Sequence, residues 1–341
     1  MPTTGPDDTT SLDDETVPDD AQASSGPVDL DVVVLPAFAA DDFTADGDLP
    51  HEVEPWLDDY DFEHERTVPG ANAPLLTTDD GVAITPTGMG KADAAVTVAA
   101  LLSSPDLDCS DAYFVTVGIA GASPEVGTLG SVFLADHVVD WDRKQTWDSD
   151  GESEEGESDE RDESATPRSM QLLPYRPRDY AYALDDDLVA TAHEWAGEVD
   201  LRNDERADRY RERYAHAAAR AEPTVAVGTT VCGDEYWHGA TYAEQARWLV
   251  EQYDAGEYAT TEMEDYGTAT ALDRFDRLDR YLSVRGVVNF DRPPGGQPAH
   301  QSVAEGLDEV AVELGLENAY RVGSRVVDRL RDDATRGSLE R

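Results

Sequence analysis

Short runs of β-branched residues alternate along this chain with longer Ala-rich runs, and this alternation limits the folds that the chain can adopt. The predicted strands are 30–35, 82–86, 113–117, 131–139, 224–227 and 280–290, and the predicted helices are 91–102, 243–252, 268–277, 304–313 and 319–330. Strands and helices in this order are typical of α/β proteins. We therefore expect a three-layer α/β/α sandwich with a central mixed, largely parallel sheet. Ligands of such a sheet bind at the carboxyl ends of its strands.

Two acidic, low-complexity segments fall outside this pattern. Residues 1–28 are rich in Asp, Pro and Thr, and residues 148–166 hold ten acidic residues among nineteen. Neither segment can bury enough apolar surface to fold by itself. We expect 1–28 to be a disordered tail and 29–335 to form a single domain, with 148–166 as a disordered acidic insertion.

The charge of the chain excludes two classes of partner. It carries 26 basic and 74 acidic residues, a formal net charge of −48. Nucleic acids and anionic membrane surfaces are both bound through Lys and Arg, so neither suits this chain. No run reaches the roughly 18 apolar residues of a membrane helix, and the acidic N-terminus lacks the basic region of a signal peptide. These features predict a cytoplasmic protein with no direct membrane insertion.

Two glycine-rich segments follow predicted strands. Gly88 and Gly90 lie between a strand and a helix, where glycines let backbone amides approach a ligand. A Walker A loop is excluded because Thr85 stands where it needs Gly and Ala92 where it needs Ser or Thr. A tight turn is the structural alternative. The second segment, 118–121, follows the next strand, so the two segments would border one crevice.

Three further segments carry polar and aromatic side chains. Residues 233–239 put two aromatic residues and a His after a strand, 262–268 group three carboxylates around a Met, and 284–294 end an apolar strand in Asn, Asp and Arg. The aromatic pair has core packing as its alternative, and the carboxylates have a charged helix N-terminus as theirs. Polar residues at the end of a buried strand indicate a site in this fold class.

The order of these segments carries a family resemblance. Along the chain they read TGMGKADAA (87–95), GIAGASPEVGTLGSV (118–132), VCGDEYW (231–237), EMEDYGTATAL (262–272) and RGVVNFDRP (285–293). This order resembles the nucleoside phosphorylase and nucleosidase superfamily, and within it the purine nucleoside permease family. The resemblance spans about residues 30–330 and leaves out the acidic tail and the acidic insertion.

The resemblance implies a purine nucleoside as ligand and assigns residues to its two halves. In that superfamily the N-glycosidic bond breaks through an oxocarbenium-like sugar, while the base is protonated or hydrogen-bonded at N7. Met263 and Glu264 match the pair under the ribose, where the Glu accepts hydrogen bonds from the 2′ and 3′ hydroxyls. Tyr236 matches the aromatic residue that stacks on the base, with Trp237 beside it.

Glycine-rich positions complete the implied site. Ala120 and Gly121 match the segment that lines the base and the sugar, and Gly88 and Gly90 match the loop beneath it. The resemblance implies no cofactor and no metal, and it leaves open a homo-oligomeric assembly.

The residue facing the base departs from the nucleosidases of the superfamily. Counted from Arg285, their usual Ser-Asp pair falls on Val288 and Asn289, so the expected acid is an amide. Asn289 can bridge N7 and O6 of a 6-oxopurine, which favours inosine or guanosine over adenosine. Alternatively, the nearby Asp291 acts as the general acid with a raised pKa.

The nucleophile and the function have alternatives. The loop 36–43 lacks the Gly-Asp-x-x-Arg pattern that phosphorylases use for phosphate, so water is the more natural attacker, activated by Asp41, Glu52 or Glu54. This favours a purine nucleoside hydrolase over a phosphorylase. The alternative is a non-catalytic nucleoside-binding protein associated with nucleoside transport. A chain without a spanning helix cannot form a permeation path by itself, so such a role would be indirect.

The acidic excess also predicts a response to salt. Self-repulsion destabilises a compact acidic chain, and about 1 M salt shortens the Debye length to about 3 Å. Our hypothesis is adaptation to a salt-rich cytoplasm, and its alternative is a solvated acidic face without a salt requirement. The melting temperature, followed by circular dichroism, should rise between low and multi-molar KCl. An unchanged melting temperature would contradict the hypothesis.

Overall fold

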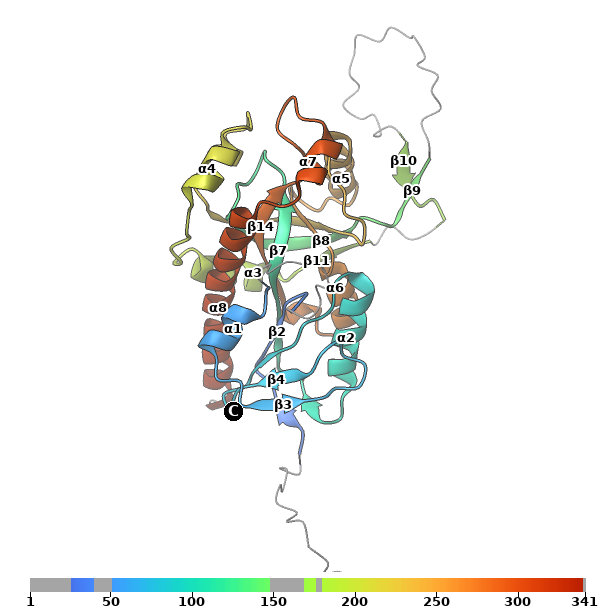
Figure 1. Ribbon diagram of the computed structural model, residues 1–341. Helices are drawn as coiled ribbons and strands as arrows, with labels where there is room; N and C mark the ends of the chain where they lie inside the picture. Colours follow the sequence, from blue (N-terminus) through green and yellow to red (C-terminus); the bar gives the residue numbers. More distant parts are fainter. Residues whose placement is uncertain (1–25, 40–50, 148–168, 176–179, 340–341) are drawn as a thin grey trace, which may run out of the picture.

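The computed structural model describes residues 26–39, 51–147, 169–175 and 180–339, whose arrangement is shown in Figure 1. The acidic insertion at 148–166 and all but the end of the 1–28 tail lie outside the described residues. The expectations for these two segments therefore stay predictions.

A mixed sheet forms the centre of the molecule. Its strands are β2 (Val32–Leu35), β3 (His64–Arg66), β4 (Leu75–Thr77), β5 (Val82–Ile84), β7 (Tyr113–Ala122), β8 (Val132–Asp140), β11 (Ala181–Ala183), β12 (Val225–Cys232), β13 (Tyr258–Glu262) and β14 (Tyr281–Phe290). Two short ladders lie apart from it: β1 (Val28–Asp29) pairs with β6 (Leu107–Asp108), and β9 (Lys144–Thr146) pairs with β10 (Met170–Leu172). Every residue of β2 is buried, as expected for a strand covered on both faces.

The sheet closes on itself, which corrects part of the predicted architecture. The α/β class and the mixed sheet are confirmed, but β8, β12, β13, β7 and β14 form a ring in place of an open layer between two helical layers. The reason lies in the length of β7 and β14, which have ten residues each. A strand of this length can pair with two neighbours in succession along one edge. β7 pairs with β2 as far as Thr116 and with β13 at Gly121 and Ala122.

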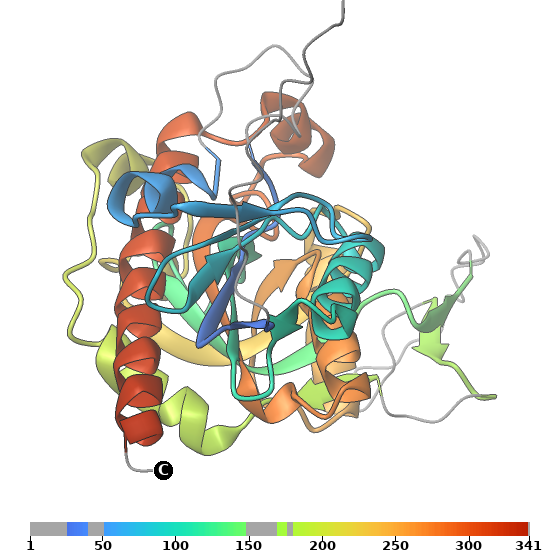
Figure 2. The same ribbon diagram turned by 90° about the horizontal axis from the view of Figure 1, so that it is seen from below.

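The helices cover the outside of these strands. They are α1 (Glu54–Asp59), α2 (Lys91–Ser103), α3 (Asp186–Ala196), α4 (Glu205–Arg211), α5 (Ala240–Gln252), α6 (Asp265–Arg274), α7 (Ala299–Glu305) and α8 (Glu309–Leu339), with short 3-10 turns at Ala218–Arg220 and Leu278–Arg280. Helix α8 packs along β14 and β7, and α2 packs on α6. Figure 2 shows α8 and α2 on opposite sides of the central strands.

Two expected elements differ in the structure. Residues 118–121 were expected to form a glycine loop, but they continue β7 to Ala122. The helix expected over 304–313 is wrong, because α7 ends at Glu305 and Gly306 adopts a positive φ of 75°. A new helix, α8, starts at Glu309, where the Asp308 carboxylate accepts hydrogen bonds from the N–H groups of Val310 and Ala311.

Candidate functional site

A cavity of about 240 Å³ lies at the carboxyl ends of β7, β13 and β14, beside the segment that follows β12. Most of its wall is apolar, with a few convergent polar groups, as is typical of sites for small organic ligands. The structure brings together here the predicted residues Ala120, Gly121, Tyr236, Trp237, Met263, Glu264 and Asn289. Segments far apart in the sequence therefore meet where the carboxyl ends of these strands lie together.

Three other predicted residues do not line the cavity. Gly90 lies behind the wall, where its N–H donates to Oε1 of Glu264 over 3.0 Å. Gly88 has a φ of +84°, and a Cβ there would come within 2.8 Å of the Cβ of Asp93. Both glycines shape the turn before α2. Asp291 is 1% exposed and accepts a hydrogen bond of 3.2 Å from the Tyr258 hydroxyl, so it faces the protein interior.

Burial raises the pKa of Asp291, but the side chain does not line the cavity. Loss of water raises the pKa of this carboxyl to about 7, while Arg292 and the Tyr258 hydroxyl oppose the rise. Its side chain nevertheless contacts Tyr258 and Arg292 and not the cavity. Of the two predicted donors to the base, Asn289 is the one that lines the cavity.

A buried guanidinium organises the carboxylates at one end of the cavity. Arg285, on β14, is ion-paired with Glu262 at 3.0 Å, with Glu264 at 3.3 Å and with Asp265. All four side chains are nearly inaccessible to solvent. Buried charges are stable only when they are paired and hydrogen-bonded, and here each carboxylate shares the same cation. The three carboxylates raise the pKa of Arg285 further above its already high value.

Asp265 fixes the orientation of Arg285. Its carboxylate accepts hydrogen bonds from the hydroxyls of Thr116 (2.9 Å), Tyr281 (2.9 Å) and Ser283 (2.5 Å), in addition to the guanidinium. Burial alone would raise the pKa of Asp265, but Arg285 and these hydroxyls bring it below its usual value. Asp265 is therefore the carboxyl of this cluster whose pKa is lowered.

In contrast to Asp265, Glu262 and Glu264 have pKa values above the usual value for a glutamate. Burial raises the pKa of Glu262 to about 8, with the Asp265 charge adding to the rise and Arg285 opposing it. Burial likewise raises the pKa of Glu264, although Arg285 and the Gly90 N–H oppose it. The N–H groups of Glu264 and Asp265 both donate to Oε2 of Glu262, which holds the start of α6 in place. Glu264 thus presents its carboxyl to the cavity from a fixed backbone.

Of the two candidate bases among the described residues, Glu52 lines the cavity and Glu54 does not. Its Oε2 accepts a hydrogen bond of 2.5 Å from the Ala37 N–H, and its Oε1 accepts one of 2.8 Å from the Ile119 N–H. Burial raises the pKa of this carboxyl to about 7, and the nearby Glu264 adds to the rise. By contrast, the Glu54 side chain is 61% exposed and pairs with His51, and Asp41 lies outside the described residues.

Asn289 and the aromatic residues form the other end of the cavity. The Asn289 Nδ2 donates one hydrogen to the Phe290 carbonyl over 3.1 Å, which leaves its second hydrogen for a ligand. Gly121 makes room for it, since a Cβ at Gly121 would lie 3.1 Å from that Nδ2. Tyr236 is 57% exposed at the cavity wall, whereas Trp237 is buried and stacks on Trp141 at 5.1 Å.

Comparisons with known proteins place the chain in a family. The model of the purine nucleoside permease (NUP) family matches residues 29–335. This chain belongs to the purine nucleoside permease family. A probable purine nucleoside permease from Schizosaccharomyces pombe is 31% identical over 306 residues, covering 82% of this chain and 86% of that protein. A purine nucleoside permease from Candida albicans is 24% identical over 299 residues, covering 81% and 71%. The family expected from the sequence motifs is confirmed.

Solved structures share the fold of this purine nucleoside permease family member. The 5′-methylthioadenosine/S-adenosylhomocysteine nucleosidase from Neisseria meningitidis matches with a TM-score of 0.52 and 18% identity, covering 87% of this chain and 97% of that one. Futalosine hydrolase of Helicobacter pylori matches with a TM-score of 0.53 and 15% identity, covering 89% and 98%. The fold therefore resembles that of nucleosidases.

The described part of this family member contains no helix that is both long and apolar enough to span a membrane. Its possible metal ligands also lie away from the cavity. Among the described residues, Glu63, His64 and Asp79 form a group whose ligand atoms lie within 4.8 Å of one another. All three are exposed, and none of them lines the cavity.

Sequence reasoning missed the roles of Arg285 and Asp265. Arg285 served only as a reference point for counting, and Asp265 was one of three carboxylates in a segment. A signal was present, because an Arg within the apolar run 280–290 must be buried and therefore needs buried carboxylates. The segment 262–268 is where those carboxylates occur.

The contact between Glu52 and β7 can be tested through Gly118. A Cβ at this position would overlap Oε1 of Glu52 and lie 3.0 Å from Nη1 of Arg285. Gly118→Ala should lower the free energy of unfolding by about 1–3 kcal/mol through overpacking, measured by urea titration at constant high salt. The control is Gly197→Ala, where the nearest atoms lie at 3.4 Å, and we expect it to stay within about 1 kcal/mol of the wild type. Equal values for the two variants would contradict the position of Glu52.

Proposed function

We propose that this chain binds purine nucleosides in the cavity and hydrolyses their N-glycosidic bond. The observation that carries the proposal is Glu52, a buried carboxyl with a pKa near 7 that lines the same cavity as Glu264 and Asn289. A group with a pKa near the working pH is suited to act as a general base. The family name and the nucleosidases among the structural neighbours support a nucleoside as the ligand.

The ribose would lie against Met263 and Glu264. A carboxylate next to the 2′ and 3′ hydroxyls can accept a hydrogen bond from each, and the Gly90 N–H holds the Glu264 carboxyl in place for this. Negative charge near the sugar also stabilises the positive charge that develops on an oxocarbenium-like sugar.

The base would lie between Tyr236 and the Asn289 amide. The Tyr236 ring can stack on the planar base, while the free Nδ2 hydrogen of Asn289 can be shared between N7 and O6 of a 6-oxopurine. A hydrogen bond to N7 is strongest when the base carries negative charge as a leaving group. Asn289 would therefore stabilise the transition state more than the ground state.

Water is the nucleophile that suits this cavity. The oxygen of the water molecule would attack C1′ while Glu52 takes a proton from that water. The electrons of the C1′–N9 bond would leave with the base, and the base would then take up a proton from solvent. The products are free base and ribose. The described lining contains four glutamates, Glu52, Glu235, Glu262 and Glu264, and no Lys or Arg. Arg285 is already shared by three carboxylates, so the described wall offers little to a phosphate ion.

The names of the two relatives favour a second candidate function. Both are purine nucleoside permeases, the first named as probable, which suggests a nucleoside-binding role associated with transport. Binding without turnover would use the same ribose and base contacts. Only the fate of the glycosidic bond separates the two functions.

Turnover of inosine tests the proposal. The full chain, in multi-molar KCl, should release hypoxanthine and free ribose from inosine at the same rate with and without phosphate. The rate should fall below about pH 7, because Glu52 must be deprotonated to accept a proton and burial raises its pKa to about 7. Products are measured by chromatography. Ribose 1-phosphate formed only with phosphate would indicate a phosphorylase, and inosine binding without products would favour the transport-associated role.

Two substitutions serve as a matched pair for this test. Glu52→Gln removes the base but keeps the size of the side chain, and it should lower kcat by at least about 100-fold. Glu54→Gln, two residues away at an exposed position, should leave kcat within about twofold. Equal rates for the two variants would rule out Glu52 as the base.

Asn289 should set the preference between 6-oxopurines and adenosine. In Asn289→Asp, a carboxyl can accept a hydrogen from the 6-amino group and repels O6, so the ratio of kcat/KM for inosine over adenosine should fall at least about tenfold, or about 1.4 kcal/mol. Asn289→Ala should slow both substrates without favouring adenosine. An unchanged ratio in Asn289→Asp would exclude the amide contact.

A further inference from the structure

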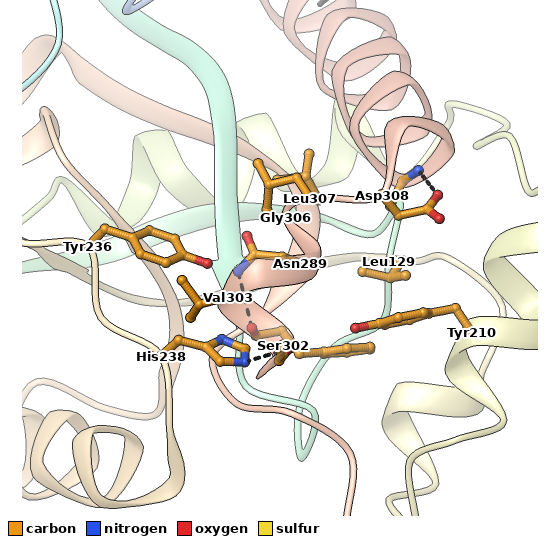
Figure 3. A pocket seen from close by; sticks show the side chains of 13 residues that line it. Leu129, Tyr210, Tyr236, His238, Asn289, Ser302, Val303, Gly306, Leu307 and Asp308 are labelled. Atoms are coloured by element: carbon orange, nitrogen blue, oxygen red, sulfur yellow. Dashed lines mark hydrogen bonds between the residues drawn. The ribbon is translucent and has the colours of Figure 1, made fainter. Parts of the chain in front are cut away.

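A second cavity of about 230 Å³ adjoins the proposed nucleoside site. We call it the outer chamber; Tyr210, His238, Phe290, Ser302, Val303 and Ala311 belong to its wall and not to that of the first cavity (Figure 3). The two cavities share Tyr236, Val288, Asn289 and Leu307 as lining residues. Asn289 and Tyr236 therefore stand at the junction between them.

The outer chamber lies at the base end of the proposed site. Glu52, Met263 and Glu264, which would surround the ribose and the water, line the first cavity only. Asn289, which would contact N7, lines both. On a purine, the atom next to N7 along that edge is the substituent on C6. A base held at N7 by Asn289 thus has its C6 substituent beside Asn289, at the junction with the outer chamber.

The walls of the outer chamber indicate what it can accept. Leu129, Val303, Leu307 and Ala311 contribute apolar surface, and Tyr210 and Phe290 contribute rings. Its polar side chains include His238 and Ser302, which hydrogen-bond to each other at 3.1 Å, and Asp308, which caps α8; the Nδ1 of His238 is buried without a hydrogen-bond partner among the described residues. None of the described lining residues is Lys or Arg, and Asp308 is acidic. The chamber therefore disfavours an anionic group.

We propose that the outer chamber receives an uncharged apolar or aromatic substituent on C6 of the base, so that the ligands include 6-substituted purine nucleosides. This inference rests on the proposed nucleoside site and specifies its ligand class. The volume of the outer chamber, about 230 Å³, is sufficient for a ring, because a buried apolar cavity of about 150 Å³ can hold benzene. Burial of such a group against these apolar side chains would favour binding, because its apolar surface leaves water.

Dissociation constants of three nucleosides test the inference. The probes are inosine, 6-benzyloxypurine riboside and 5′-benzylthio-5′-deoxyinosine, titrated by calorimetry into the full chain carrying Glu52→Gln so that turnover does not consume them. The 6-substituted probe should bind at least as tightly as inosine and at least about tenfold more tightly than the 5′-substituted probe. Binding of inosine with a tenfold loss for the 6-substituted probe would overturn the inference and leave the nucleoside site intact. Failure of all three probes to bind would overturn the nucleoside site itself, and the inference with it.

A pair of Val→Trp substitutions locates the bound substituent. Val303→Trp on α7 fills the outer chamber and should weaken binding of the 6-substituted probe at least about tenfold, while inosine changes less than about threefold. Val96→Trp on α2, also an exposed helical valine but outside both cavities, should leave both affinities unchanged. An equal loss of both ligands in Val303→Trp, or no loss of either, would place the substituent elsewhere and overturn the inference.

Discussion

One guanidinium, buried where the strands close on themselves, holds the acidic end of the candidate site together. Arg285 neutralises part of the charge of Glu262, Glu264 and Asp265, and these carboxylates in turn keep it buried. Three carboxylates and one cation cannot all remain ionised away from water at low cost. The structure resolves this through unequal hydrogen bonding: Asp265 receives three hydroxyls and stays charged, whereas burial raises the pKa of Glu262 to about 8.

The buried carboxyl groups of the site therefore differ from the many other acidic residues of the chain in what controls their charge. The net charge of −48 is spread over the whole sequence, including the segments outside the described residues. Three glutamates of the cavity wall, Glu52, Glu262 and Glu264, are held by backbone N–H groups or by Arg285, and burial raises their pKa values. Salt screens exposed charges strongly and buried ones weakly, so the two groups should respond differently to ionic strength.

Sequence patterns were sufficient to predict the α/β class, the family and several residues of the cavity wall. The α/β alternation and the ordered motifs placed Tyr236, Glu264 and Asn289 near strand ends, because strand ends of one sheet meet at one edge. The closure of the sheet could not be predicted, since it depends on β7 and β14 changing neighbours along their length. The short strand β13 and the break at Gly306 were missed because their signals are a few residues long, and tertiary contacts decide such segments. The choice of Glu52 over Glu54 needed coordinates, because two residues of sequence do not show which side chain points inward.

The change of neighbours along β7 leaves a gap in its hydrogen-bonding edge. Between Thr116, the last residue paired with β2, and Gly121, paired with β13, no strand of the described residues accompanies β7 on that side. The Ile119 N–H lies in this gap, and it donates to Glu52. The carboxylate thus takes the place that a neighbouring strand would fill in a regular sheet. Because the donor is a peptide group, the side chain at position 119 can vary among related sequences without removing the hydrogen bond. The constraint on the sequence falls instead on position 118, where a Cβ would overlap Oε1 of Glu52.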